Sequence, residues 1–155
     1  MKKIIGLFII LGVIGVTFWQ LANHEEQMHA EDYLQLGIEH GVAGKHEDAI
    51  EAFKKALQEN PNYSSAYLSL GNAYGNTGRY KESIAAYKEG IQIDQRHSEV
   101  PQMEMNIAWI ANKMNDKKTA VLYSQKAIQS FTDRNNLAGV TKAASQLRMI
   151  EKNTP

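Results

Sequence analysis

The sequence repeats itself after 34 residues, and this repeat restricts the possible folds more than any other feature. The matching pairs are Tyr33 and Tyr67, Leu36 and Leu70, Gly37 and Gly71, Gly44 and Gly78, Ile50 and Ile84, and Phe53 and Tyr87. Self-similarity at a fixed period of this length is typical of chains built from stacked supersecondary units. Because one such unit cannot bury its apolar face alone, the repeat predicts an array in which neighbouring units cover one another.

Each unit is predicted to contain two amphipathic helices. In the first unit, Tyr33, Leu36 and Gly37 share one face at helical spacing, and Ile50 and Phe53 do so further along. The glycines at 44 and 78 fall between paired helices, where a helix C-terminus favours a residue with positive φ. The expected helices span residues 30–42, 46–58, 64–76, 80–93, 101–114, 117–130 and 136–151.

These residues resemble the tetratricopeptide repeat (TPR), whose pattern is W-x2-L-G-x2-Y, then A-x3-F, then P. The first copy reads Tyr33-x2-Leu36-Gly37-x2-His40, Ala49-x3-Phe53, Pro61. The second reads Tyr67-x2-Leu70-Gly71-x2-Tyr74, Ser83-x3-Tyr87, with Gln95 where the family has proline. The resemblance implies an all-α TPR solenoid of about three repeats plus a C-terminal capping helix. The residues that define the repeats structurally are then Gly37, Ala49, Phe53, Pro61, Gly71 and Tyr87.

A third, degenerate repeat requires a shift of register. An unshifted period would place Glu104 on the buried leucine position, where an unpaired charge is unfavourable. A three-residue insertion in the preceding loop instead places Ile107 and Ala108 on the Leu-Gly positions, and Ala120 and Ala127 on the small positions of the second helix. The predicted divisions are 1–23 N-terminal anchor or signal peptide, 24–29 polar linker, 30–63 first repeat, 64–97 second repeat, 101–134 third repeat and 135–152 capping helix.

The N-terminus differs in composition from the rest of the chain. Residues 4–23 are 20 positions without a charge, enough at 1.5 Å per residue to cross a bilayer core of about 30 Å. A cleaved signal peptide is the alternative, but both candidate cleavage sites have a large residue where a small one is preferred. Lys2 and Lys3 before the span predict a single-pass protein of the inner or cytoplasmic membrane, with its repeats outside the cytoplasm.

The TPR resemblance also indicates where a partner would bind. In this family the first helix of each pair lines a concave groove that accepts a peptide or a partner helix. Carried over position by position, the groove residues are Leu34, Ile38, Val42, Leu68, Asn72, Asn76, Met105 and Trp109. Most of these are apolar, and an exposed apolar strip usually marks an interaction site; packing within the fold is the alternative for several of them. Gly41 and Gly75 lie on the same side, where a missing side chain leaves room for a ligand.

Other site types find little support in the sequence. In TPR domains that clamp a C-terminal carboxylate, basic residues occupy positions that here hold Leu34, Ile38, Ser69, Met105 and Trp109, none of them basic. There is no Cys, and no catalytic or phosphate-binding motif, which predicts no enzyme activity, no metal, no cofactor and no small-molecule substrate. The balance of 17 basic and 17 acidic residues gives no reason to expect nucleic acid as a partner.

The sequence therefore predicts a membrane-anchored TPR adaptor or scaffold that binds a protein or peptide in its groove, for example in envelope complex assembly. Three alternatives remain open at this point. The chain is a self-associating structural module and so a homo-oligomer, a cleaved and secreted soluble TPR protein, or a regulator of an enzyme encoded elsewhere.

Overall fold

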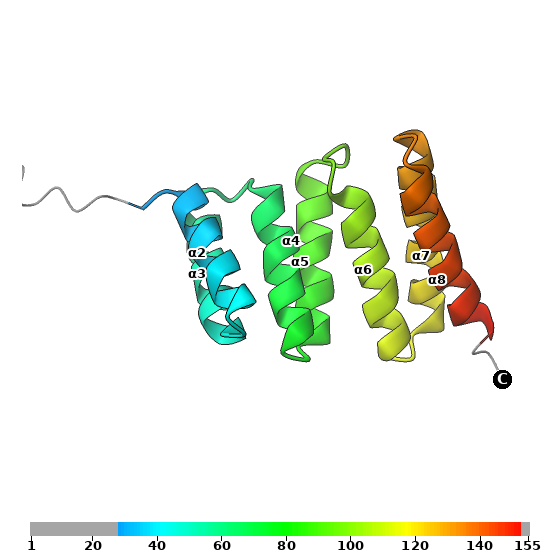
Figure 1. Cartoon of the computed structure of the whole chain (residues 1–155), viewed down its shortest axis with the longest axis horizontal. Coiled ribbons are helices and arrows are strands. Elements are labelled where there is room, and N and C mark those ends of the chain that lie inside the picture. The colour runs from blue at the N-terminus through cyan, green and yellow to red at the C-terminus, as the bar shows by residue number, and fades with distance from the viewer. Residues whose placement is uncertain (1–27, 153–155) are drawn as a thin grey trace, which may run out of the picture.

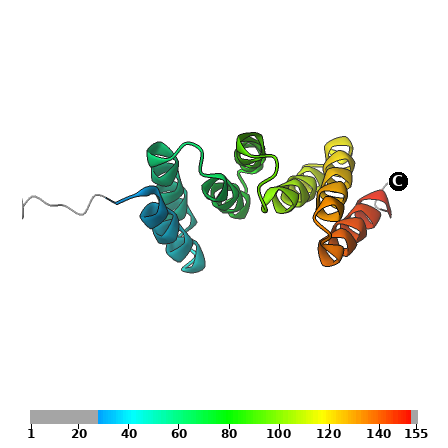
Figure 2. The same cartoon turned by 90° about the horizontal axis from the view of Figure 1, so that it is seen from above.

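The computed structural model describes residues 28–152, which form seven helices and no strand. The helices are α2 (Ala30–Val42), α3 (His46–Glu59), α4 (Ser64–Asn76), α5 (Tyr80–Ile93), α6 (Val100–Lys113), α7 (Lys117–Asp133) and α8 (Leu137–Lys152). They follow one another along the long axis of the molecule, so that each contacts mainly its neighbours in sequence (Figures 1 and 2). The prediction of an all-α repeat solenoid is confirmed.

The turns within helix pairs have the backbone conformation that the sequence predicts. Gly44 and Gly78 have φ values of +75° and +76°, in the left-handed region that glycine enters without steric penalty. Asn115 and Asn135 take the same role after α6 and α7, with φ values of 61° and 54°. Asparagine is among the few other residues that tolerate this region.

Aromatic side chains pack directly on the helix glycines of the first two repeats. Phe53 lies against Gly37 and Tyr87 lies against Gly71, and a Cβ placed on Gly71 would lie 2.6 Å from Cδ1 of Tyr87. Ser83, where the family has alanine, is fully buried, and its hydroxyl donates a hydrogen bond of 2.6 Å to the carbonyl of Gly71. Among the remaining repeat-defining residues, Ala49 is buried and Pro61 is exposed in the loop before α4.

The third repeat follows the shifted register, because Ile107, Ala108, Ala120 and Ala127 are all completely buried. The premise used to choose that register was nevertheless wrong, because Glu104 is buried as well, with only 7% of its surface exposed. Glu104 stands where the first two repeats have Tyr33 and Tyr67. Its burial raises the pKa of the carboxyl group, although Ser130, Lys126 and Arg134 partly oppose this.

The last two helices differ from a repeat pair in length and packing. Helix α7 continues to Asp133, beyond the predicted end at 130, and places Phe131 against Gly139 at the start of α8. Helix α8 then buries Ala143 and Ile150 against the preceding helices. As predicted, α8 covers the end of the solenoid.

The predicted membrane location is contradicted by the structure. Within residues 28–152, no helix is both long enough and apolar enough to cross a bilayer. The longest described helix, α7, has 17 residues, whereas a span needs about 20 predominantly apolar ones. The predicted anchor, residues 1–23, and most of the predicted linker lie outside the described residues.

Candidate functional site

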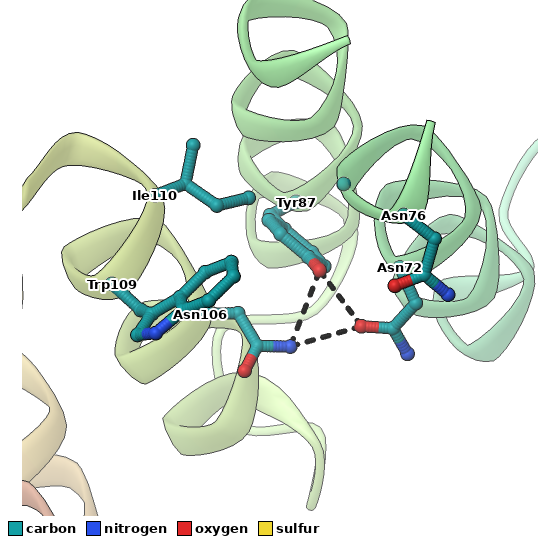
Figure 3. Close-up of a pocket in the computed structure, with 7 residues that line it drawn as sticks. Asn72, Asn76, Tyr87, Asn106, Trp109 and Ile110 are labelled. Carbon is teal, nitrogen blue, oxygen red and sulfur yellow. Dashed lines mark hydrogen bonds between the residues drawn. The ribbon is translucent and has the colours of Figure 1, made fainter. Parts of the chain in front are cut away.

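Two adjoining pockets lie along the first helices α2, α4 and α6. The larger, of about 340 Å³, is lined by Asn72, Gly75, Asn76, Tyr87, Asn106, Trp109 and Ile110 (Figure 3). The second, of about 230 Å³, is lined by Ile38, Gly41, Val42, His46, Phe53, Ser69, Asn72, Ala73 and Asn76. Because Asn72 and Asn76 of α4 line both, the pockets flank α4 and together form what we call the groove.

The structure places five of the eight predicted groove residues in this groove, namely Ile38, Val42, Asn72, Asn76 and Trp109. Their side chains are open to solvent: Val42 is 86% exposed, Trp109 48% and Ile38 42%. These three apolar side chains come from α2 and α6, on either side of the two asparagines of α4. The groove therefore has apolar walls and a polar centre.

The other three predicted positions lie outside the pockets. Leu34 and Leu68 are half-buried and pack against the cores of the first two repeats. Met105 is 4% exposed and packs with Phe131 and Ala143. Helix α8 covers this part of α6, where Gln146 Nε2 donates a hydrogen bond of 3.0 Å to the Met105 carbonyl. The capping helix thus ends the groove before it reaches Met105.

A hydrogen-bonded network forms the centre of the groove. The Tyr87 hydroxyl donates to Asn72 Oδ1 at 2.7 Å, and Asn106 Nδ2 donates to the same oxygen at 3.0 Å and to the Tyr87 hydroxyl at 3.2 Å (Figure 3). Gln102 Nε2 donates to Asn106 Oδ1 at 2.7 Å. Burial raises the pKa of Tyr87, which keeps its hydroxyl protonated and able to donate.

The residues that line the groove carry no carboxylate, ammonium or guanidinium group. His46 contributes an imidazole whose Nδ1 is buried without a hydrogen-bond partner. Just outside, the Lys113 ammonium lies 4.4 Å from the centre of the Trp109 ring, within range of a cation–π interaction. Within residues 28–152, no group of three or more His, Asp and Glu side chains is placed to hold a metal ion.

Sequence analysis missed three groove residues. Asn106 lies in the repeat with the shifted register, so no simple period aligns it with Asn72, although the two asparagines are 34 positions apart and bonded to each other. Tyr87 was assigned a purely structural role, but its hydroxyl reaches the floor of the larger pocket. His46 begins α3, a second helix, and so was not among the positions considered.

Comparisons with known proteins agree with this architecture. Residues 43–103 match the family model described as tetratricopeptide repeat. No curated protein gives a significant match to the sequence. The fold is similar to several solved structures, all of them below 25% sequence identity.

One of these structures is PcrH of Pseudomonas aeruginosa in complex with the chaperone binding region of PopD, with 20% identity and a TM-score of 0.73 over 81% of this chain and 92% of that chain. Another is the Yersinia enterocolitica type III secretion chaperone SycD with a peptide of the translocator YopD, with 21% identity and a TM-score of 0.68 over 81% and 94%.

A third is the TPR2B domain of yeast Sti1 in a complex with pHsp70, with 15% identity and a TM-score of 0.74 over 79% of this chain and 96% of that chain. At these identities the similarity establishes the fold alone. The match over residues 43–103 and the shared fold together support the tetratricopeptide-repeat family for this chain.

Proposed function

We propose that this protein is an adaptor that binds a peptide segment of a partner protein in the groove between α2, α4 and α6. The observation that carries the proposal is the exposure of Ile38, Val42 and Trp109 around the open pockets. Exposed apolar side chains gathered at one place favour a binding surface over a solvated face. Aromatic residues such as Trp109 are also enriched at the centres of protein interfaces.

The solved structures of similar fold support a peptide as the class of ligand. SycD was solved with a peptide of a translocator, and PcrH with the chaperone binding region of PopD. The present chain shares with them only the architecture, so its partner is a separate question. The pockets of the groove are shallow and open to solvent, which suits an extended segment better than an enclosed small molecule.

Site-specific photocrosslinking in cells tests the proposal. A photoreactive phenylalanine analogue replaces Trp109 in the groove or Leu122 on α7, which lines neither pocket. Both side chains are 48% exposed, so the two positions are matched in accessibility. We expect a discrete crosslinked partner at position 109 and none at 122, with mass spectrometry identifying the partner and the crosslinked peptide.

Equal capture at both positions, or capture at 122 alone, would count against the groove. A crosslink at position 109 to a second copy of the chain would instead support the self-associating module. Light scattering on residues 24–155 gives an independent measure of that alternative.

A further inference from the structure

The groove carries more information about its ligand than its shape alone. The hydrogen bonds at its centre run in one direction, because Tyr87 and Asn106 both donate to Asn72 Oδ1. A carbonyl oxygen has two lone pairs, so these two donors use its acceptor capacity. The Asn72 amide nitrogen points away from the network (Figure 3), and Asn72 therefore offers N–H donors to whatever occupies the groove.

The two apolar pockets limit the spacing of the ligand's side chains. Packed helices have axes about 8–10 Å apart, and the pockets flank a single helix, α4, so their occupants are separated by about that distance. Side chains on one face of a β-strand recur every about 6.6 Å, which is too short. One turn of a polyproline II helix, three residues, advances about 9.3 Å and returns the side chain to the same direction.

A polyproline II segment also suits the polar centre of the groove. Its backbone makes no internal hydrogen bonds, so its carbonyls are free to accept from Asn72. Segments of this kind characteristically dock on aromatic surfaces, and Trp109 provides one. The absence of charged side chains among the residues lining both pockets favours an uncharged segment, because a buried ligand charge would have no counterpart there.

Gly41 and Gly75 add a steric condition. Each lies within a helix and lines one of the pockets, and neither is needed for packing. A Cβ at Gly41 would meet no atom within 4 Å, and one at Gly75 would meet only Ile110 Cδ1 and Ser83 Oγ, both at an ordinary 3.5 Å. An added methyl group would therefore fit the fold and take up space at the pocket wall.

From these observations we propose that the groove binds an uncharged polyproline II segment with apolar side chains three residues apart. One side chain fills each pocket, and a main-chain carbonyl between them accepts a hydrogen bond from Asn72 Nδ2. Asn72 and the two glycines are then specificity-determining residues. This inference rests on the proposed function, since it names the ligand class of the same groove.

Fluorescence anisotropy with the full chain and three labelled synthetic peptides tests the inference. The first peptide has two leucines three residues apart in an uncharged Pro- and Ser-rich background. The second has the leucines two residues apart, and the third keeps the longer spacing but flanks the leucines with glutamates. We expect the first peptide to bind at least about tenfold more tightly than either of the others, the difference that 1.4 kcal/mol produces.

Asn72→Asp tests the polarity of the centre. An aspartate still accepts from Tyr87 and Asn106 but no longer donates, so it sets two acceptors against each other. We expect it to weaken the first peptide's binding about tenfold, whereas Asn62→Asp, which adds the same charge in the exposed loop before α4, leaves binding unchanged. Thermal unfolding of both variants shows whether the fold is retained, and Gly75→Ala supplies a second variant expected to bind more weakly while remaining folded.

Three results would each overturn the inference: no binding of the first peptide, equal binding of all three, or full binding by Asn72→Asp. If position 109 still crosslinks to a partner in any of these cases, the proposed function stands and only the ligand class fails. If the crosslink to a partner is also absent, the groove itself is the wrong site.

Discussion

Two glycines of α4, four residues apart, lack a side chain for different reasons. Gly71 lies under the ring of Tyr87, whereas Gly75 has free space around it. We expect Gly71→Ala to lower the free energy of unfolding by about 1–3 kcal/mol through overpacking. We expect Gly75→Ala to raise it by up to about 1 kcal/mol, because alanine is the better helix former.

Urea unfolding followed by circular dichroism measures both values. Equal destabilisation by the two substitutions would show that Gly75 also serves the packing of the fold, and would remove the reason to assign it to the ligand.

Glu104 makes the stability of the fold depend on pH. Burial raises the pKa of its carboxyl group above the value in the unfolded chain, so the folded state holds this proton more tightly. The contribution of Glu104 to stability is therefore fully present below the unfolded pKa and is lost as pH rises through the folded one. We expect Glu104→Gln, neutral at every pH, to be increasingly more stable than the natural chain as pH rises through that range.

Thermal unfolding across a pH series checks this prediction. Glu59→Gln, at the exposed end of α3, removes the same charge at the surface and should change stability by less than about 0.5 kcal/mol. A constant difference between Glu104→Gln and the natural chain at all pH values would contradict the role assigned to Glu104.

At the scale of whole helices, α8 stabilises the solenoid by covering its last apolar face. Ile150 is 2% exposed and packs with Ala111 and Ala120, whereas its neighbour Met149 is 61% exposed. We expect Ile150→Ala to cost about 2–4 kcal/mol of unfolding free energy, because it leaves a cavity between helices. Met149→Ala should change it by less than about 0.5 kcal/mol. Similar losses from both, in urea titrations, would mean that α8 does not pack as a fixed cap.

The helices were predictable because each is determined by local pattern. Apolar residues at helical spacing locate α2 to α6 closely, and Gly44 and Gly78 mark the turns within the first two pairs. The predicted end of α7 at 130 was too early, because the extra turn depends on the contact between Phe131 and Gly139, which belongs to two different helices. A period of 34 residues says nothing about such a contact beyond the last repeat.

The groove was less predictable than the helices for the same physical reason. Exposure of Ile38 and Trp109 follows from their position on a first helix, but burial of Met105 depends on how far α8 folds back over α6. The direction of the hydrogen bonds at Asn72 depends on Asn106, which a loop insertion separates from its repeat position. Sequence pattern locates a surface well, whereas its chemistry depends on contacts between helices.

Over the whole molecule, charge is balanced, with 17 basic and 17 acidic residues, and none of the side chains lining the described groove is ionic. Binding there would rest on apolar burial and neutral hydrogen bonds, neither of which is screened by salt as exposed ion pairs are. We expect the affinity for the uncharged peptide to change less than about threefold between about 0.05 M and 0.5 M sodium chloride.

The variant Ile38→Lys supplies the comparison, because it places one cation in the wall of the smaller pocket without altering a buried position. With this variant, we expect the glutamate-flanked peptide to gain affinity at low salt and to lose that gain at high salt, as an exposed ion pair should. A steep loss of the natural chain's affinity for the uncharged peptide as salt rises would place the main attraction in charges beyond the two pockets. The solenoid would then act through its outer surface, and α2, α4 and α6 would serve only to hold that surface in place.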